Sequence, residues 1–373
     1  MSRLNINRLT NENEDGSPKI TGITTFSSNA FLEAPKGSTA QRPENVAPGM
    51  IRFNTDSGHL EYYTGEFWDE VLVANNTLDG GNRGLFGGGA TPGYVNTIEY
   101  ITISTPGNAI DFGDLQNAGI TYSSNSSSTR GLFANGYTGS QINTINYITI
   151  SSTGNAQDFG DCTVINHDRA GLSNSTRGIF GGGSTTNTVD YVTIASTGNA
   201  QDFGDLTAAR RSVSGCSSST RGLFAGGNDG DPLQYNIIDY VTISTTGNAL
   251  DFGDLLAQRT AVGSLSNSTR AIFAGGTNTP TYAAVNVIQY ITIATTGDTV
   301  DFGDLSTLSN SNAGVSSPTR GVFRFGSGTG QALTNIIEYI TILSTGNSID
   351  FGDSTYTANS VGDSGCSNGH GGL

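Results

Sequence analysis

Two kinds of charged side chain recur at fixed spacing in this sequence. An Asp-Phe-Gly-Asp motif occurs six times, and six arginines each precede a small residue, a hydrophobic residue and a phenylalanine. The first aspartates of the motif are Asp111, Asp158, Asp202, Asp251, Asp301 and Asp350. The last five of the arginines are Arg130, Arg177, Arg221, Arg270 and Arg320. We predict a structural role for both sets, in which Arg–Asp pairs and hydrogen bonds from aspartate to the backbone join neighbouring repeats.

Other chemistry is open to these side chains. Paired carboxylates could hold a calcium ion, which needs several oxygen atoms converging on one site. The three histidines, His59, His167 and His370, are scattered, and no Ser-His-Asp or Cys-His arrangement is indicated. Two acids could flank a glycosidic bond, but nearly every aspartate here is periodic, and a catalytic pair should break the periodicity. We therefore expect no enzymatic activity, no metal site and no cofactor.

The residues best suited to binding lie in the one interval of each repeat that varies in length. From the phenylalanine of the arginine motif to a Tyr-hydrophobic-Thr-Ile motif there are 14, 14, 11, 16, 17 and 16 residues. Aromatic and acidic residues that the repeat does not require fall in these intervals: Tyr94, Tyr137, Asp229, Asp231, Tyr235 and Tyr282. Variable loops on one face are typical of recognition, and tyrosine can stack on sugars or anchor a protein contact. The alternative for each residue is an ordinary exposed loop position.

Short strands must carry these residues. The other intervals are constant: 12 residues separate the tyrosine from the Asp-Phe-Gly-Asp phenylalanine, and 18 separate that phenylalanine from the next arginine. In the fourth repeat we expect strands over 211–218, 222–227, 237–244 and 249–254. The last two are joined by a Thr-Gly-Asn hairpin turn. Four strands in each of six repeats are typical of propeller blades.

The repeats resemble kelch repeats. The shared features are an arginine before the first strand (Arg169, Arg211 and Arg259), Gly-Gly ending the second, and an aromatic residue near the end of the fourth. The resemblance implies an all-β, six-bladed propeller over residues 76–373. The aromatic residue is phenylalanine rather than tryptophan, so the likeness is to the architecture and not to one kelch family. Residues 361–373 are similar to the first strand of the fourth repeat, and we expect them to complete the first blade and close the ring.

Residues 1–75 lack the repeat. We expect an extended polar arm and then a β-hairpin that turns at Asp56-Ser-Gly, between strands over 51–54 and 60–63. Its small core is expected to consist of Tyr62, Tyr63, Phe67 and Trp68.

The hairpin segment resembles a short module of phage tail-fibre and other virion proteins. The shared string is Gly-Met-Ile-Arg-Phe-Asn-Thr from Gly49, followed by Leu-Glu-Tyr-Tyr, Gly and Trp. The whole chain is similar to structural proteins of marine cyanophages. This implies a tail- or fibre-associated virion protein that binds other virion proteins through residues 1–70. Its propeller would contact a host surface receptor or glycan. A capsid decoration or head fibre, and a carbohydrate-active enzyme on a propeller scaffold, are the alternatives.

Composition limits the partners and the compartment. The formal net charge is −15, which disfavours nucleic acid and an anionic membrane surface as partners. No segment has the length and apolar character of a membrane span or a signal peptide, so no membrane insertion is expected. The three cysteines, Cys162, Cys216 and Cys366, suit free thiols in a chain made in a bacterial cytoplasm and then incorporated into the virion.

Overall fold

The computed structural model describes residues 34–71, 82–184, 186–230, 234–327, 334–358 and 364–373. The chain divides into two compact units, residues 1–74 and 75–373. Both are built from β-strands, and the described residues include no α-helix, which confirms the all-β prediction.

The N-terminal unit is one four-stranded sheet with the order β1-β2-β3-β4. Its strands are β1 (Lys36–Gly37), β2 (Ile51–Asn54), β3 (His59–Tyr63) and β4 (Trp68–Val71). β2 and β3 pair antiparallel, with Ile51 opposite Tyr62, as the predicted hairpin requires.

The core of this sheet differs from the prediction, because its buried face is polar. Arg52, Asn54 and Glu61 are buried, whereas Tyr62 and Phe67 are 36% and 57% exposed. Glu61 accepts hydrogen bonds from Arg52 Nη1 at 2.9 Å and from Asn54 Nδ2 at 3.2 Å. In an alternating strand one face must turn outward, and here it is the apolar face.

The repeat unit contains six four-stranded antiparallel sheets in its described part, with four strands in each repeat as predicted. Sheet 1 consists of β30 (Ser364–Ser367), β5 (Arg83–Thr91), β6 (Gly93–Thr102) and β7 (Ile110–Asp114). Sheet 2 consists of β8 (Ser123–Ser126), β9 (Arg130–Ala134), β10 (Ile142–Thr149) and β11 (Gln157–Asn166). Sheet 3 consists of β12 (Ala170–Ser173), β13 (Arg177–Gly181), β14 (Thr188–Thr193) and β15 (Gln201–Asp205).

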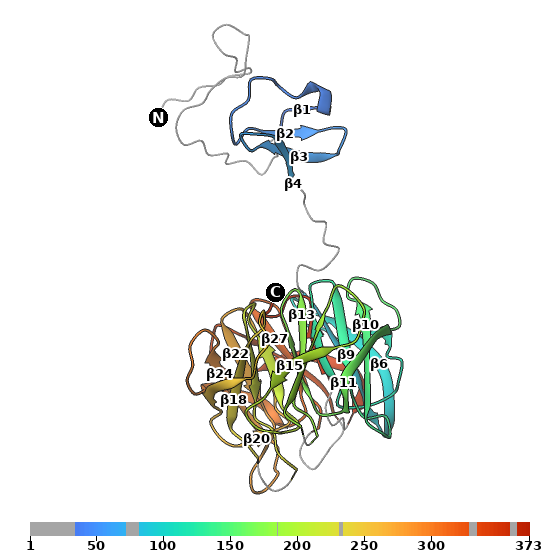
Figure 1. The fold of residues 1–373 in the computed structure, drawn as a ribbon, viewed down its shortest axis with the longest axis vertical. Coiled ribbons are helices and arrows are strands. Elements are labelled where there is room, and N and C mark those ends of the chain that lie inside the picture. The colour runs from blue at the N-terminus through green and yellow to red at the C-terminus, as the bar shows by residue number, and fades with distance from the viewer. Residues whose placement is uncertain (1–33, 72–81, 185, 231–233, 328–333, 359–363) are drawn as a thin grey trace. The chain divides into compact units, whose positions relative to one another are not determined.

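The other three sheets follow the same order (Figure 1). Sheet 4 consists of β16 (Ser214–Ser217), β17 (Arg221–Ala225), β18 (Ile237–Thr242) and β19 (Leu250–Asp254). Sheet 5 consists of β21 (Gly263–Ser266), β22 (Arg270–Ala274), β24 (Val285–Thr292) and β25 (Val300–Ser309). Sheet 6 consists of β26 (Ala313–Ser316), β27 (Arg320–Arg324), β28 (Thr334–Thr341) and β29 (Ile349–Ala358). The short strands β20 (Arg259–Thr260) and β23 (Thr277–Asn278) pair beside sheet 5.

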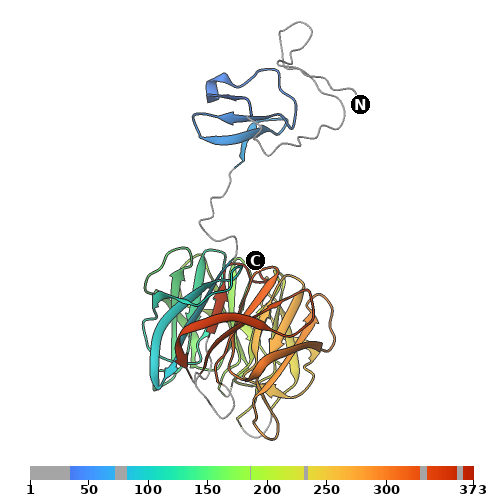
Figure 2. The ribbon, with the colours of Figure 1, turned by 180° about the vertical axis from the view of Figure 1, so that it is seen from behind.

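Sheet 1 is assembled from both ends of the repeat unit. β30 pairs antiparallel with β5, and Cys366 lies opposite Leu85. The last strand of the chain therefore lies beside strands that precede it by more than 260 residues in the sequence (Figure 2).

Neighbouring sheets are joined where a hairpin turn meets the outer strand of the preceding sheet. Between sheets 1 and 2, Gly154 N–H donates to Phe112 O and Ala156 N–H to Asp114 O, both at 2.8 Å. Asn155 Oδ1 accepts from Asp114 N–H at 3.1 Å. The same backbone bonds recur at each following joint, and the turn of sheet 1 makes them to Phe351 and Asp353 of sheet 6.

The Asp-Phe-Gly-Asp motif is explained by this joint. Its phenylalanine is buried in the apolar layer between sheets, as Phe112 is at 2% exposure. Its glycine has φ near +147° at Gly113, and a Cβ there would lie 2.5 Å from Gly154 O. Only glycine fits so close a backbone approach with this torsion. The first aspartates of the six motifs, which were the predicted ion-pair partners, are all exposed.

The periodic arginines also join neighbouring sheets, but not through aspartate. The Arg130 guanidinium lies 4.5 Å from the Tyr147 ring centroid, and its Nη1 donates to Ile194 O of sheet 3 at 2.9 Å. Tyr147 packs edge-on against Phe159 at 6.1 Å. The same ring and carbonyl contacts occur at Arg177, Arg221, Arg270 and Arg320. None of these five arginines forms an ion pair in the described part of the chain, so the predicted Arg–Asp pairing is not found.

Candidate binding site

A row of aromatic rings crosses the loops of sheets 1 and 2. The Tyr94 and Tyr137 rings lie 6.1 Å apart in an edge-on arrangement, and the His167 ring lies 5.7 Å from Tyr137. Tyr94 lies in the hairpin of β5 and β6, Tyr137 in the loop after β9, and His167 in the turn after β11. Tyr94 is 41% exposed, so the row begins at the surface. The structure thus brings together two of the predicted binding residues and adds a histidine.

The row ends at a cavity. His167 Nε2 lies 3.4 Å from Asp168 Oδ2, and Asp168 lines a cavity of about 100 Å³. Thr121, Ser212 and Ser311 line the same cavity. Burial raises the pKa of the Asp168 carboxyl, while the charges of His167 and Arg211 lower it.

The rim of this cavity has an unusual backbone. Thr121, Asp168, Ser212, Ala261 and Ser311 occupy equivalent positions before the innermost strands, and their φ angles lie between 52° and 58°. Such residues cost of order 1–3 kcal/mol each and concentrate at functional sites. Three of them are tied to the next, since the N–H groups of Ser212, Ala261 and Ser311 donate to the preceding rim carbonyl. The rim is therefore strained and also well anchored.

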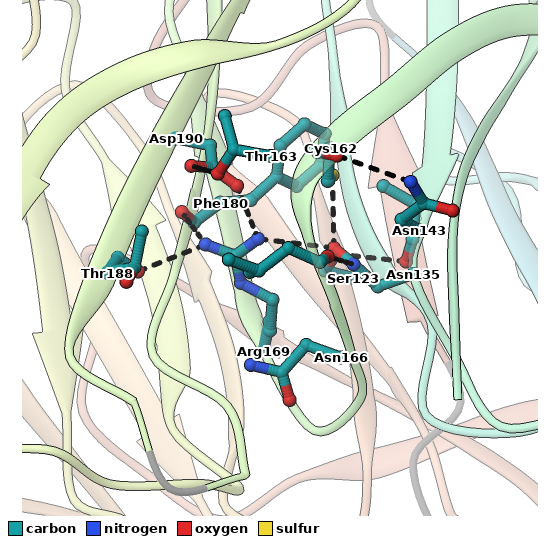
Figure 3. A network of polar contacts seen from close by, with 12 residues as sticks. Ser123, Asn135, Asn143, Cys162, Thr163, Asn166, Arg169, Phe180, Thr188 and Asp190 are labelled. Carbon is teal, nitrogen blue, oxygen red and sulfur yellow. Dashed lines mark hydrogen bonds and ion pairs between the residues drawn. The ribbon is translucent and has the colours of Figure 1, made fainter. Parts of the chain in front are cut away.

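Arg169 forms part of the cavity wall and is held rigidly (Figure 3). Its Nη1 pairs with Asp190 Oδ2 at 2.7 Å, and its Nη2 donates to Phe180 O and Thr188 O at 2.8 and 3.0 Å. Its Nε donates to Gly182 O at 3.0 Å. Because every nitrogen of this guanidinium already has an acceptor, Arg169 positions the wall and offers no free cation to a ligand.

Sheet 4 repeats this arrangement with Arg210. Its Nη2 lies 2.8 Å from Asp239 Oδ2, and its Nη1 donates to Gly226 O at 2.7 Å. The sequence comparison assigned Arg211 to this place, but Arg211 instead donates to Asn228 in the adjoining loop. A buried acceptor precedes the motif tyrosine in all six repeats: Glu99, Asn146, Asp190, Asp239, Gln289 and Glu338. A polar residue fixed between two apolar ones was the signal that could have identified this set.

A second group of predicted residues lies in the loop of sheet 4. Tyr235 Oη lies 3.3 Å from Asp229 Oδ2. Burial raises the pKa of Tyr235, and the nearby Asp229 charge adds to the rise. Tyr282 is 48% exposed in the loop of sheet 5. Asp231 lies outside the described residues.

Two further searches bear on the site. Within the described ranges, no group of three or more His, Cys, Asp or Glu side chains is placed to hold a metal ion, so the calcium alternative has no candidate cluster there. Nor does the described part contain a helix long and apolar enough to cross a membrane. No protein-family model matches this sequence, and no curated protein matches it significantly.

Proposed function

We propose that the repeat unit is a closed six-bladed β-propeller of kelch-like architecture. The support is that each kind of contact between consecutive sheets recurs between sheets 6 and 1. Gly107 N–H donates to Phe351 O at 2.7 Å, and Arg320 Nη1 donates to Ile103 O at 2.9 Å.

A ring of serines around the proposed axis supports the same conclusion. Each innermost strand ends in a serine whose Oγ donates to the serine carbonyl of the preceding sheet, at 2.6–2.8 Å. The series runs through Ser126, Ser173, Ser217, Ser266, Ser316 and Ser367 and returns to Ser126. An open row of sheets would leave one such donor without its acceptor.

The propeller serves, in our proposal, as the recognition domain of a non-enzymatic virion protein associated with a tail or fibre. The observation that carries this role is the aromatic row of Tyr94, Tyr137 and His167 leading into a polar cavity. Partly exposed rings beside hydrogen-bonding groups suit contact with a host surface receptor or glycan.

The N-terminal unit attaches the chain to other virion proteins in this proposal. Its outward face presents Ile51, Phe53 and Phe67, which are 53%, 38% and 57% exposed. An exposed apolar face on so small a sheet suits a protein contact. The resemblance of its hairpin to virion modules agrees with that use.

Two measurements test this function. Purified chain, fluorescently labelled, should bind host cells saturably and should release no product from host polysaccharide. Antibody labelling of intact virions should place the chain on the tail or fibre. Labelling confined to the capsid would instead favour a decoration protein, and product release would favour an enzyme. A chain that binds no host cell would contradict the recognition role.

A further inference from the structure

We propose that the cavity bounded by Thr121, Asp168, Ser212 and Ser311 binds one uncharged pyranose unit of a surface glycan. This inference rests on the proposed recognition function and assigns its ligand and its site. It places the sugar at the inner end of the aromatic row, in residues that lie outside the variable loops.

The cavity has the chemistry of a sugar site. Thr121, Ser212 and Ser311 bring hydroxyl groups to its wall, and Asp168 brings a carboxylate. Apolar surface comes from Val213 and Val262 among other lining residues. Such mixed walls match a pyranose, which presents hydroxyl groups at its edge and C–H groups on its faces.

One wall group lacks a partner. Thr121 is 5% exposed, and its Oγ1 has no hydrogen-bond partner among the described residues. A buried hydroxyl without a partner costs free energy that a ligand hydroxyl can recover. The volume of about 100 Å³ holds several waters, which sugar hydroxyls could replace.

Charge selects an uncharged sugar. Asp168 is the acidic group of the wall, and the Arg169 donors are already used by Asp190 and main-chain carbonyls. An acidic sugar would bring its carboxylate toward Asp168 with no free cation to compensate, and the chain itself carries a net charge of −15. A neutral sugar gains instead, because a carboxylate can accept hydrogen bonds from two adjacent hydroxyls.

The aromatic row extends the site outward. His167 is the chain neighbour of Asp168, and Tyr137 stands against His167 with their ring centroids 5.7 Å apart. Rings in this position can pack against the C–H faces of the next sugar units. The site therefore suits the end of a glycan chain rather than a free monosaccharide.

Binding of the full chain to an array of neutral and acidic glycans, followed by calorimetry with the strongest neutral glycan, tests the inference. Asp168→Asn should weaken binding at least tenfold, and Thr121→Val, which keeps the branched shape, should weaken it severalfold. Tyr282→Ala, an exposed tyrosine in another loop, should leave affinity unchanged. Thermal melts should show that each variant is folded.

The outcomes separate the inference from the function on which it rests. Unchanged affinity in folded Asp168→Asn and Thr121→Val, with host-cell binding retained, would overturn the sugar site but leave the recognition role standing. A preference for acidic glycans would also overturn it. A wild-type chain that binds neither cells nor any glycan would overturn both.

Discussion

At the scale of single residues, neighbouring sheets fit together through matched sizes. Leu172 of sheet 3 points at Gly222 of sheet 4, and a Cβ on that glycine would lie 2.5 Å from Leu172 Cδ1. At the joint between sheets 4 and 5 the pair is Cys216 with Ala271, which lie in one apolar cluster. A smaller inward side chain is thus accompanied by a larger one on the facing strand.

Asn125 breaks this pattern and gives the first prediction. It is 4% exposed, faces Gly178 as Leu172 faces Gly222, and neither atom of its amide has a hydrogen-bond partner among the described residues. Asn125→Leu should raise the free energy of unfolding by about 1–3 kcal/mol, the usual cost of a buried unsatisfied polar group. Chemical denaturation measures it. Cys216→Leu is the control and should destabilise, because Ala271 leaves no room.

The motif glycine gives a second prediction. At Gly204 φ is +145°, and a Cβ would lie 2.5 Å from Gly247 O, whereas at Gly198, with φ +156°, nothing lies within 4 Å. Gly204→Ala should lower the free energy of unfolding by about 1–3 kcal/mol more than Gly198→Ala, since only the first adds a steric clash to the backbone strain. Equal losses in the two variants would mean that the close approach of the sheets has been misjudged.

At the scale of elements, the repeat pattern was sufficient to predict the strands. In the fourth repeat the observed strands Arg221–Ala225, Ile237–Thr242 and Leu250–Asp254 lie within two residues of the expected bounds at each end. The side-chain partners could not be predicted in the same way. Arg130 reaches a carbonyl in the next sheet, and main-chain acceptors leave no trace in a sequence.

The candidate site was only half visible in the sequence. Tyr94 and Tyr137 stood out because they lie in intervals of variable length. His167 and Asp168 lie in the constant 18-residue interval between Phe159 and Arg177, where nothing marks them as different from structural positions. Their role depends on a backbone turn that brings them to the rim.

The polar core of the N-terminal sheet gives a third prediction. The hydrogen bond from Arg42 lowers the pKa of Glu61 below its ordinary 4.5. A lowered pKa stabilises the folded state above pH 4.5, and that contribution is lost as the pH falls from there through the folded-state value. Fluorescence of Trp68, the one tryptophan of the chain, should therefore report unfolding of this unit in acid.

Two glutamate variants provide the controls. Glu61→Gln should destabilise the N-terminal unit already at neutral pH, because Arg52 keeps a buried charge without its partner. Glu66→Gln changes an exposed glutamate of the same unit and should leave the acid transition in place. An acid transition identical in wild type and Glu61→Gln would rule out Glu61 as the responsible group.

At the scale of the whole molecule, the tail of the chain lies where the serine ring leaves its axis. His370 Nε2 lies 2.9 Å from Ser126 O, and Gly371 N–H donates to Ser266 O at 2.9 Å. The last residues thus contact sheets 2 and 5 as well as the first sheet. Closure by the C-terminal strand removes the exposed strand edges that an open array would present for aggregation.

Hydrogen exchange, measured at peptide resolution, tests this closure most directly. Gly107 and Ala109 bond to sheet 6 as Gly154 and Ala156 bond to sheet 1, so each joint has internal controls in the same molecule. We predict that the amides of the 107–109 turn and of β5 exchange as slowly as those of the equivalent turns and strands in sheets 2–5. Fast exchange at 107–109, β5 and β30 while sheets 2–5 stay protected would contradict the closed ring.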